Sequence, residues 1–429
     1  MGTEKYHLKC VEGGELVVTD GYTNTCPEGH DSLLRTVYSK KQIQKRSGQG
    51  MFNYIDWLPV DEAIPTSASP ITYKSDGFGK ELGLMNLYIG FSGYWPERGA
   101  FMKTCTFKEL EALPTVQRVK ERAGGKIVIV ASAGNTSRAF AEVAAATGMP
   151  VVTVVPSGSL PRMWTTTGNH DSIFLIAVDG DYSDAIAVGK QIVQMEGLVE
   201  EGGVKNVARR DGMGVVELEA AFAMSGLPDY YFQAVGSGTG AIAAWEAFSR
   251  LIDDGRFGTK MPRIVIAQNF PFAPMVSAWQ AGRAEFIADM DMKDAESAIQ
   301  QMYADVLSTR NPPYSIRGGV YDMLSSTNGT MYGITNDEAR EAEKLFEGEE
   351  GIDLDPAASV AVASLIKAVD DGVVKTEDRI LLNITGGGYK RVKEDCKRYE
   401  IGARCEMKPS DQGALDDVEK ELREFFRAP

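Results

Sequence analysis

Runs of β-branched and other apolar residues recur along the chain from about residue 85 onward. They occupy residues 86–91, 126–131, 150–155, 172–178, 230–235, 263–268 and 379–384. Segments with apolar residues at helical spacing, such as SRAFAEVAAAT and AIAAWEAFSRLI, separate most of these runs. Because the runs are continuously apolar rather than alternating, both faces of their sheet must be covered. The pattern predicts an α/β fold with a parallel sheet between layers of helices.

The remaining parts of the chain have weaker patterns. Residues 1–35 are polar and rich in turn residues, which predicts a small β-ribbon. Segment 280–350 is charged and is predicted to be helical or irregular, and the final EKELREFFRAP predicts a terminal helix. A chain of 429 residues is long for one hydrophobic core and comfortable for two domains.

The composition excludes several classes of protein. Apolar residues make up 43% and charged residues 24%, as in an ordinary globular protein. With 45 Lys and Arg against 60 Asp and Glu, the net charge is −15, which argues against nucleic acid or an anionic membrane as partner. The opening MGTEKYHLKC lacks a signal-peptide core, and no apolar run is long enough to span a bilayer. Five scattered cysteines suggest free thiols, so we expect a cytoplasmic protein.

Cys10, Cys26 and His30 are the candidate metal ligands of the N-terminal segment. Structural zinc sites usually have four ligands, often in close CxxC pairs. Gly13 stands where the second cysteine of a first pair would fall, and His30 follows Cys26 at an irregular spacing. From this ligand count we expect a ribbon without bound metal.

Three loops that follow predicted strands have unusual sequences. They are SAGNTS at 132–137, GSGTG at 236–240 and TGGG at 385–388. Ligands of parallel α/β sheets bind at the carboxyl ends of the strands, where such loops lead into helices. These loops are therefore the first place to look for a binding site.

The GSGTG loop has the properties of a phosphate site. Its glycines let several N–H groups point at one place, and a predicted helix follows at once. It lacks the lysine of a Walker loop. A dinucleotide fingerprint would also need an acid at the end of the next strand, which instead ends in Gln268-Asn269. A single phosphate group is the expected ligand.

Lys108 lies in FMKTCTFKELEA, just before a predicted helix. The sequence contains four motifs in order: a lysine in T-F-K, then S-x-G-N-T, then a Gly-rich loop, and a late T-G-x-G. The same order occurs in the pyridoxal-phosphate enzymes of the tryptophan synthase β type. The chain resembles this fold type II family, which implies pyridoxal 5′-phosphate as cofactor. It also implies two three-layer α/β/α domains with the cofactor cleft between them. Residues 36–109 and 211–429 would form the large domain, and residues 110–210 a small mobile domain.

Other motifs resemble the threonine synthase branch of that family. ASAGNTSRAFA, NITGGGYKR and IDLDPAASVAVASL have counterparts there, and KCVEGG…CPEGH looks like a degraded form of its leading cysteine ribbon. The stretch NLYIGFSGYWPERGAFMKTCTFKELEA departs from the threonine synthases and resembles the cysteate synthases of methanogenic archaea. That resemblance implies replacement of the phosphate of O-phospho-L-serine by sulfite, on a route to coenzyme M.

The resemblance also implies which residues hold the cofactor. Lys108 would bind it covalently and then carry protons, which agrees with the lowered pKa of an amine shielded from water. Asn135 would bond the ring hydroxyl, and Thr385 would meet the pyridine nitrogen. The cofactor phosphate would bind at Gly236, Ser237, Gly238, Thr239 and Gly240.

The expected substrate contacts lie close to these residues. Ser132 and Thr136, at the start of a helix, suit a substrate carboxylate. Arg209 in NVARRDG resembles a family arginine that binds phosphate or sulfite. In the implied reaction Lys108 removes the α-proton, phosphate leaves the β-carbon, sulfite adds there, and Lys108 returns a proton.

Other interpretations stay open at this stage. A threonine synthase would act on O-phosphohomoserine in a longer pocket, and a cysteine synthase would combine O-phosphoserine with sulfide. A non-catalytic small-molecule binding protein on the same fold is a third possibility, against which Lys108, Asn135 and Thr385 argue. The family also implies a homo-oligomer, a dimer or larger.

Overall fold

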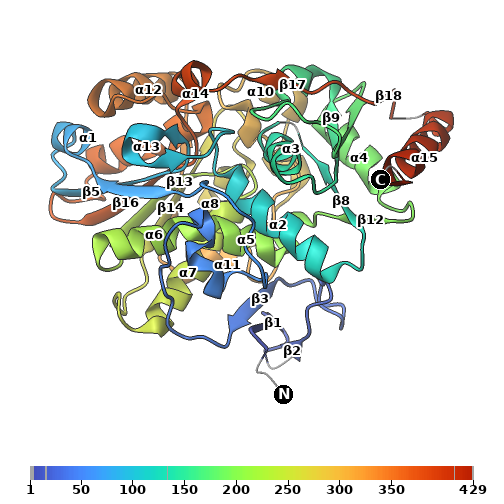
Figure 1. The fold of residues 1–429 in the computed structure, drawn as a ribbon. Coiled ribbons are helices and arrows are strands. Elements are labelled where there is room, and N and C mark those ends of the chain that lie inside the picture. The colour runs from blue at the N-terminus through green and yellow to red at the C-terminus, as the bar shows by residue number, and fades with distance from the viewer. Residues whose placement is uncertain (1–3, 15–16, 133, 410, 428–429) are drawn as a thin grey trace.

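A computed structural model describes residues 4–14, 17–132, 134–409 and 411–427. Two helix-covered sheets make up most of the molecule, and a small N-terminal sheet lies at one end (Figure 1). Residues 1–3 and 15–16 of the predicted ribbon, Ala133 of the SAGNTS loop, and residues 410 and 428–429 lie outside the described residues.

The larger sheet has six strands, and helices cover both of its faces. Its strand order is β15 (Thr330–Ile334), β14 (Arg263–Asn269), β13 (Tyr230–Ala234), β16 (Arg379–Ile384), β5 (Asn86–Phe91) and β4 (Ile71–Lys74). All neighbours are parallel except β4, which runs antiparallel to β5. The helices α12 (Asn336–Glu350) and α13 (Pro356–Asp370) lie on one side, and α6 (Val215–Met224) and α7 (Thr239–Asp254) lie on the other (Figure 1).

The smaller sheet has five parallel strands. Their order is β12 (Leu198–Glu200), β8 (Ile127–Ala131), β9 (Val151–Pro156), β11 (Ile173–Val178) and β18 (Cys405–Met407). In β9, Val151 and Val155 pack with α3 (Asn135–Thr147), whereas Val152 and Val154 pack with α4 (Tyr182–Ile192) and α15 (Gln412–Arg427). Two apolar faces on one strand explain why these segments are continuous apolar runs.

The N-terminal sheet is a three-stranded antiparallel ribbon in the order β2 (Val17–Val18), β1 (Tyr6–Cys10), β3 (Leu34–Tyr38). It is fixed to the rest of the molecule through α2 (Lys108–Arg122). The buried Arg118 of this helix donates to Asp20 at 2.6 Å and to Asn24 at 2.9 Å. A charge-assisted pair of this kind orders the loop that precedes Cys26.

The other elements are short. The helices are α1 (Gly77–Glu81), α5 (Val207–Met213), α8 (Pro274–Gln280), α9 (Ala288–Asp291), α10 (Ala295–Gln300), α11 (Val320–Ser326) and α14 (Tyr389–Asp395). The strands are β6 (Tyr94–Trp95), β7 (Ala100–Phe101), β10 (Trp164–Thr165) and β17 (Tyr399–Glu400). Within the described ranges, no helix combines the length and apolar character needed to cross a bilayer.

The predicted elements are confirmed, with one correction. Each listed apolar run forms a strand, the N-terminal ribbon is present, and the chain ends in a helix. The prediction for 280–350 was wrong in one part, because β15 lies within it and pairs with β14 at the edge of the larger sheet. The domain boundaries stay a prediction; β18, from outside 110–210, joins the smaller sheet.

Candidate active site

A cavity of about 970 Å³ opens where loops at the carboxyl ends of β8, β13 and β16 converge. Every residue to which the resemblance gave a role lines this cavity. These residues are Lys108, Ser132, Asn135, Thr136, Arg209, Gly236, Ser237, Gly238, Thr239, Gly240 and Thr385. Residues far apart in the sequence are therefore brought to one place, as predicted from the rule for parallel sheets. Cys10, Cys26 and His30 are not among the lining residues.

Lys108 is the first residue of α2, and the backbone before it is tied to the TGGG loop. The N–H of Phe107 donates to the carbonyl of Thr385 at 2.9 Å, and Thr106 bridges to Gly386. The lysine Nζ lies 3.0 Å from an oxygen of Glu111, one turn further along the helix. Burial lowers the pKa of Lys108, and the carboxylate of Glu111 opposes this shift.

Glu111 and Arg209 form a buried charge cluster with Lys108 and Glu201. Arg209 Nε lies 3.2 Å from Glu111, and its Nη1 lies 2.8 Å from Glu201. Burial favours the neutral acid at Glu111, but Arg209 and Lys108 outweigh it and lower the pKa of this carboxyl. Burial raises the pKa of Glu201 against the opposing effect of Arg209. Arg209, expected to hold a substrate anion, is thus paired with two carboxylates in this structure.

Asn135 begins α3, and neighbouring side chains set the direction of its amide. Arg138 donates from Nη2 to Asn135 Oδ1 at 2.9 Å, and Asn135 Nδ2 lies 3.5 Å from Asp355 Oδ2. The hydroxyl of Tyr389 donates to the same oxygen of Asp355 at 2.8 Å. Arg138 also bonds the carbonyl of Thr104 at 3.0 Å. The amide is therefore held by a network that joins three loops of the site.

The GSGTG loop forms a cradle of backbone groups at the start of α7. Gly238 has a φ of +86°, and a Cβ there would lie 2.5 Å from Val320 Cγ2. A Cβ on Gly240 would lie 2.4 Å from Gln233 Nε2. Ser237 Oγ and Thr239 Oγ1 are 2.8 Å apart. Glycine is required here because the loop both turns tightly and packs closely against its neighbours.

The glycines after Thr385 have a different purpose, which is close packing of backbones. A Cβ on Gly387 would lie 2.4 Å from the carbonyl oxygen of Asp353, and one on Gly388 would lie 1.9 Å from that of Tyr94. Thr385 itself is 6% exposed at the end of β16. The loop therefore holds Thr385 firmly at the wall of the cavity.

Ser132 and Thr136 lie on either side of the start of α3. Both are largely buried, at 9% and 8% exposure, and both line the cavity. Ser132 Oγ accepts a hydrogen bond from the N–H of Gly134 at 3.3 Å. The positive end of this helix and two hydroxyls thus face the same space, a setting that suits a carboxylate.

Several functional candidates escaped sequence reasoning. Lys190, Lys205 and Arg310 bring positive charge to the cavity wall. Arg310 lies 3.3 Å from Asp181, and Lys205 lies 4.0 Å from Asp31. These are single cations in polar segments, so nothing in the sequence distinguishes them. Glu111 could have been found, because residues three apart on a helix share a face and Lys108 begins that helix.

The residues present fit pyridoxal 5′-phosphate. An aldehyde can be captured by the Lys108 amine, whose pKa burial lowers. The Gly236–Gly240 loop lines the cavity at the start of α7, where backbone N–H groups and the positive end of the helix suit a phosphate. Cavities of several hundred Å³ accommodate small organic ligands, and this cavity is of that size.

Comparison with known proteins agrees with this fit. Residues 89–386 match the family model described as "Pyridoxal-phosphate dependent enzyme". The cysteate synthase of Methanoculleus marisnigri is 54% identical over 398 residues, which cover 93% of this chain and 92% of that protein. The cysteate synthase of Methanospirillum hungatei is 56% identical over 409 residues, covering 95% of this chain and 96% of that protein.

Solved structures share the fold at low sequence identity. Maize serine racemase superimposes with a TM-score of 0.56 at 15% identity, covering 74% of this chain and 89% of its own. The L-serine ammonia-lyase of Rhizomucor miehei gives a TM-score of 0.56 at 13% identity, with 77% and 100% covered. The predicted fold class and cofactor are thereby confirmed. The chain belongs to the pyridoxal-phosphate-dependent enzymes and, among them, to the cysteate synthase family.

Proposed function

We propose that this chain replaces the phosphate of O-phospho-L-serine by sulfite, giving L-cysteate and free phosphate with pyridoxal 5′-phosphate as cofactor. The observation that carries the proposal is the convergence of Lys108, Asn135 and the Gly236–Gly240 cradle on one cavity in a chain of this family. When bound, the cofactor supplies an electron sink that weakens the bonds at the α-carbon of an amino acid. We further propose that the product enters the route to coenzyme M.

Lys108 Nζ is the proposed base that removes the α-proton and returns one after the replacement. Burial lowers the pKa of this amine, so a larger fraction is neutral and able to accept a proton. Glu111, on the same face of α2, lies 3.0 Å from the amine. An amine held in this position is already oriented for proton transfer, which lowers the entropic cost of reaching the transition state.

Both proposed reactants are anions, and the cavity wall supplies charge to receive them. Among the described residues, the carboxylate partners of Arg310 and Lys205 are Asp181 at 3.3 Å and Asp31 at 4.0 Å, both substantially exposed. A phosphate dianion can displace such weakly held partners, because exposed pairs contribute little. Arg209 remains a proposed ligand if substrate binding draws it from Glu111 or Glu201. Ser132 and Thr136 would receive the substrate carboxylate.

The test is product analysis of the purified protein with O-phospho-L-serine, with and without sulfite. We expect cysteate and one equivalent of phosphate in the presence of sulfite, and no cysteate from Lys108→Ala. Parallel tubes contain sulfide in place of sulfite, and O-phosphohomoserine in place of O-phosphoserine. Cysteine as the sole product, or threonine from O-phosphohomoserine, would overturn the proposal in favour of the respective relative.

A further inference from the structure

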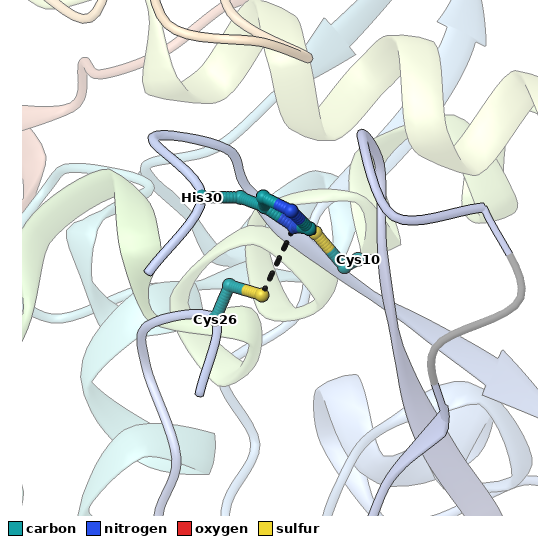
Figure 2. A group of neighbouring side chains, drawn as sticks. All are labelled: Cys10, Cys26 and His30. Atoms are coloured by element: carbon teal, nitrogen blue, oxygen red, sulfur yellow. Dashed lines mark hydrogen bonds between the residues drawn. The ribbon is translucent and has the colours of Figure 1, made fainter. Parts of the chain in front are cut away.

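Cys10, Cys26 and His30 come together in the N-terminal ribbon and are not among the residues that line the active-site cavity. Their ligand atoms all lie within 4.8 Å of one another. Figure 2 shows the imidazole of His30 beside the two cysteine side chains, and its Nδ1 is within 3.5 Å of each sulfur. Cys10 ends β1, whereas Cys26 and His30 lie on the connection that leads to β3. Folding of the ribbon, rather than spacing in the sequence, therefore creates the cluster.

The spacing of the three atoms fits a tetrahedral zinc ion. His30 Nδ1 lies 3.5 Å from Cys10 Sγ and 3.5 Å from Cys26 Sγ. With Zn–S of about 2.3 Å and Zn–N of about 2.0–2.1 Å, a tetrahedral angle places sulfur and nitrogen roughly 3.5–3.6 Å apart. The observed separations are therefore those of two edges of a zinc tetrahedron.

Groups around the cluster resemble the outer shell of a metal site. The N–H of Gly13 points at Cys10 Sγ at 3.4 Å, which stabilises a thiolate. Glu28 lies 4.0 Å from His30 Nε2, on the side of the ring opposite the sulfurs. A carboxylate on that side of the ring favours a proton on Nε2, the tautomer that leaves Nδ1 free to bind metal. These contacts are independent of the distances among the three ligand atoms.

We propose that Cys10, Cys26 and His30 bind one Zn²⁺ ion, with the fourth position taken by water from the solvent side. Two sulfurs and an imidazole favour zinc over calcium or magnesium, which prefer oxygen. Both cysteines are buried, whereas the His30 side chain is 31% exposed, so water can reach the ion beside the ring. The proposal departs from the expectation of a metal-free ribbon, which was based on the number and spacing of ligands in the sequence.

The ion would brace one wall of the active-site cavity. Just after His30, the carbonyl of Asp31 accepts from the N–H of Arg317 at 3.3 Å, and Leu33 donates to Arg317 at 3.0 Å. Just before Cys26, the hydroxyl of Tyr22 donates to the carbonyl of Glu200 at 3.1 Å. Asp31 and Glu200 both line the cavity. Zinc would therefore hold two rim segments together without touching substrate.

Metal content of the wild-type holoenzyme is the primary measurement. After growth with added zinc and purification without chelators, we expect about one zinc per chain by mass spectrometry. Exchange with Co²⁺ should give intense visible bands of a tetrahedral ion and a near-ultraviolet sulfur-to-cobalt band. Zinc far below one equivalent together with an absent sulfur-to-cobalt band would overturn the proposal, whatever the enzyme's activity.

Variants show which residues bind. We expect Cys26→Ser and His30→Gln each to weaken zinc binding at least tenfold in competition with a chromophoric chelator. Cys405→Ser, which removes a cysteine on β18, is the matched control and should keep one zinc. Full zinc content in both Cys26→Ser and His30→Gln would place the ion elsewhere and refute the assignment. If a variant does not fold, the wild-type cobalt spectrum still decides.

Discussion

Glu111 should control how much of Lys108 is neutral at a given pH. Its carboxylate lies 3.0 Å from Lys108 Nζ, is fully buried, and raises the pKa of the amine that burial lowers. In Glu111→Gln this anion is lost, whereas the nearby Arg209 cation remains. The loss of the anion and the remaining Arg209 cation both disfavour the charged amine. The pKa of Lys108 should therefore fall further, and the pH profile of its reactions should move to lower pH.

The size of the effect follows from the contact. A hydrogen bond to a charged group contributes about 1.5–3 kcal/mol, which corresponds to a factor of about 10 to 100 between neutral and charged amine. The assay mixes cofactor-free protein with pyridoxal phosphate over a pH series and follows the absorbance of the captured cofactor. Below the midpoint of the profile, capture by Glu111→Gln should be faster by that factor, because only the neutral amine attacks the aldehyde.

Glu109→Gln is the matched control for this experiment. Glu109 follows Lys108 on the same helix and, like Glu111, is buried. Its Oε1 accepts from the N–H of Thr104 at 2.6 Å instead of contacting Lys108. Burial raises the pKa of Glu109 to about 8, so near neutral pH it is already uncharged. Its replacement should leave the profile in place. A Glu111→Gln profile that stays where it is, or moves to higher pH, would refute the reasoning.

Three further changes test other parts of the site. Gly238→Ala should weaken cofactor binding at least tenfold in an absorbance titration, because its Cβ would lie 2.5 Å from Val320 Cγ2; Gly255→Ala, at the other end of α7 with φ +80° and open space, should bind normally. Arg209→Ala should lower kcat/KM for O-phosphoserine while the cofactor spectrum stays normal, and unchanged kinetics would reject its role. Burial raises the pKa of Glu217 to about 8. The folded state therefore holds a proton that the unfolded state releases, and wild-type stability should fall from about pH 4.5 to 8; Glu217→Gln should flatten that fall in urea unfolding.

Much of the scaffold was predictable because its strands are buried on both faces. A run such as 150–155 must be apolar throughout when α3 covers one face and α4 the other, so it stands out without an alignment. The strands β12, β15 and β18 are short or lie at sheet edges. These short or edge strands do not need apolar residues throughout, so they form because they pair with a neighbouring strand.

The site was predictable to the extent that its chemistry resides in loops with unusual composition. A side chain at Gly238 or Gly240 would collide with neighbours, so the structure requires glycine at both positions. The resulting Gly-rich loop can be recognised in the sequence. Arg138, Glu201 and Asp355 act through contacts between segments, and these contacts cannot be read from any one segment of the sequence. The cluster of Cys10, Cys26 and His30 does not follow the spacing rule for the same reason, since Cys10 meets Cys26 only across the folded ribbon.

The charges of the cavity explain how a chain of net charge −15 could handle anionic reactants. Next to Lys108, Arg209 is balanced by Glu111 and Glu201, so the reacting centre has little excess positive charge. A strong fixed positive charge there would keep the product phosphate bound after its bond to the substrate has broken. The carboxylate partner of Arg310, Asp181, is half exposed and therefore weakly held. Arg310 can bind an entering phosphate in its place and pair with Asp181 again when the phosphate leaves. We therefore expect Arg310→Ala to raise KM for O-phosphoserine more than it lowers kcat. An unchanged KM with a reduced kcat would place the phosphate at Arg209 instead.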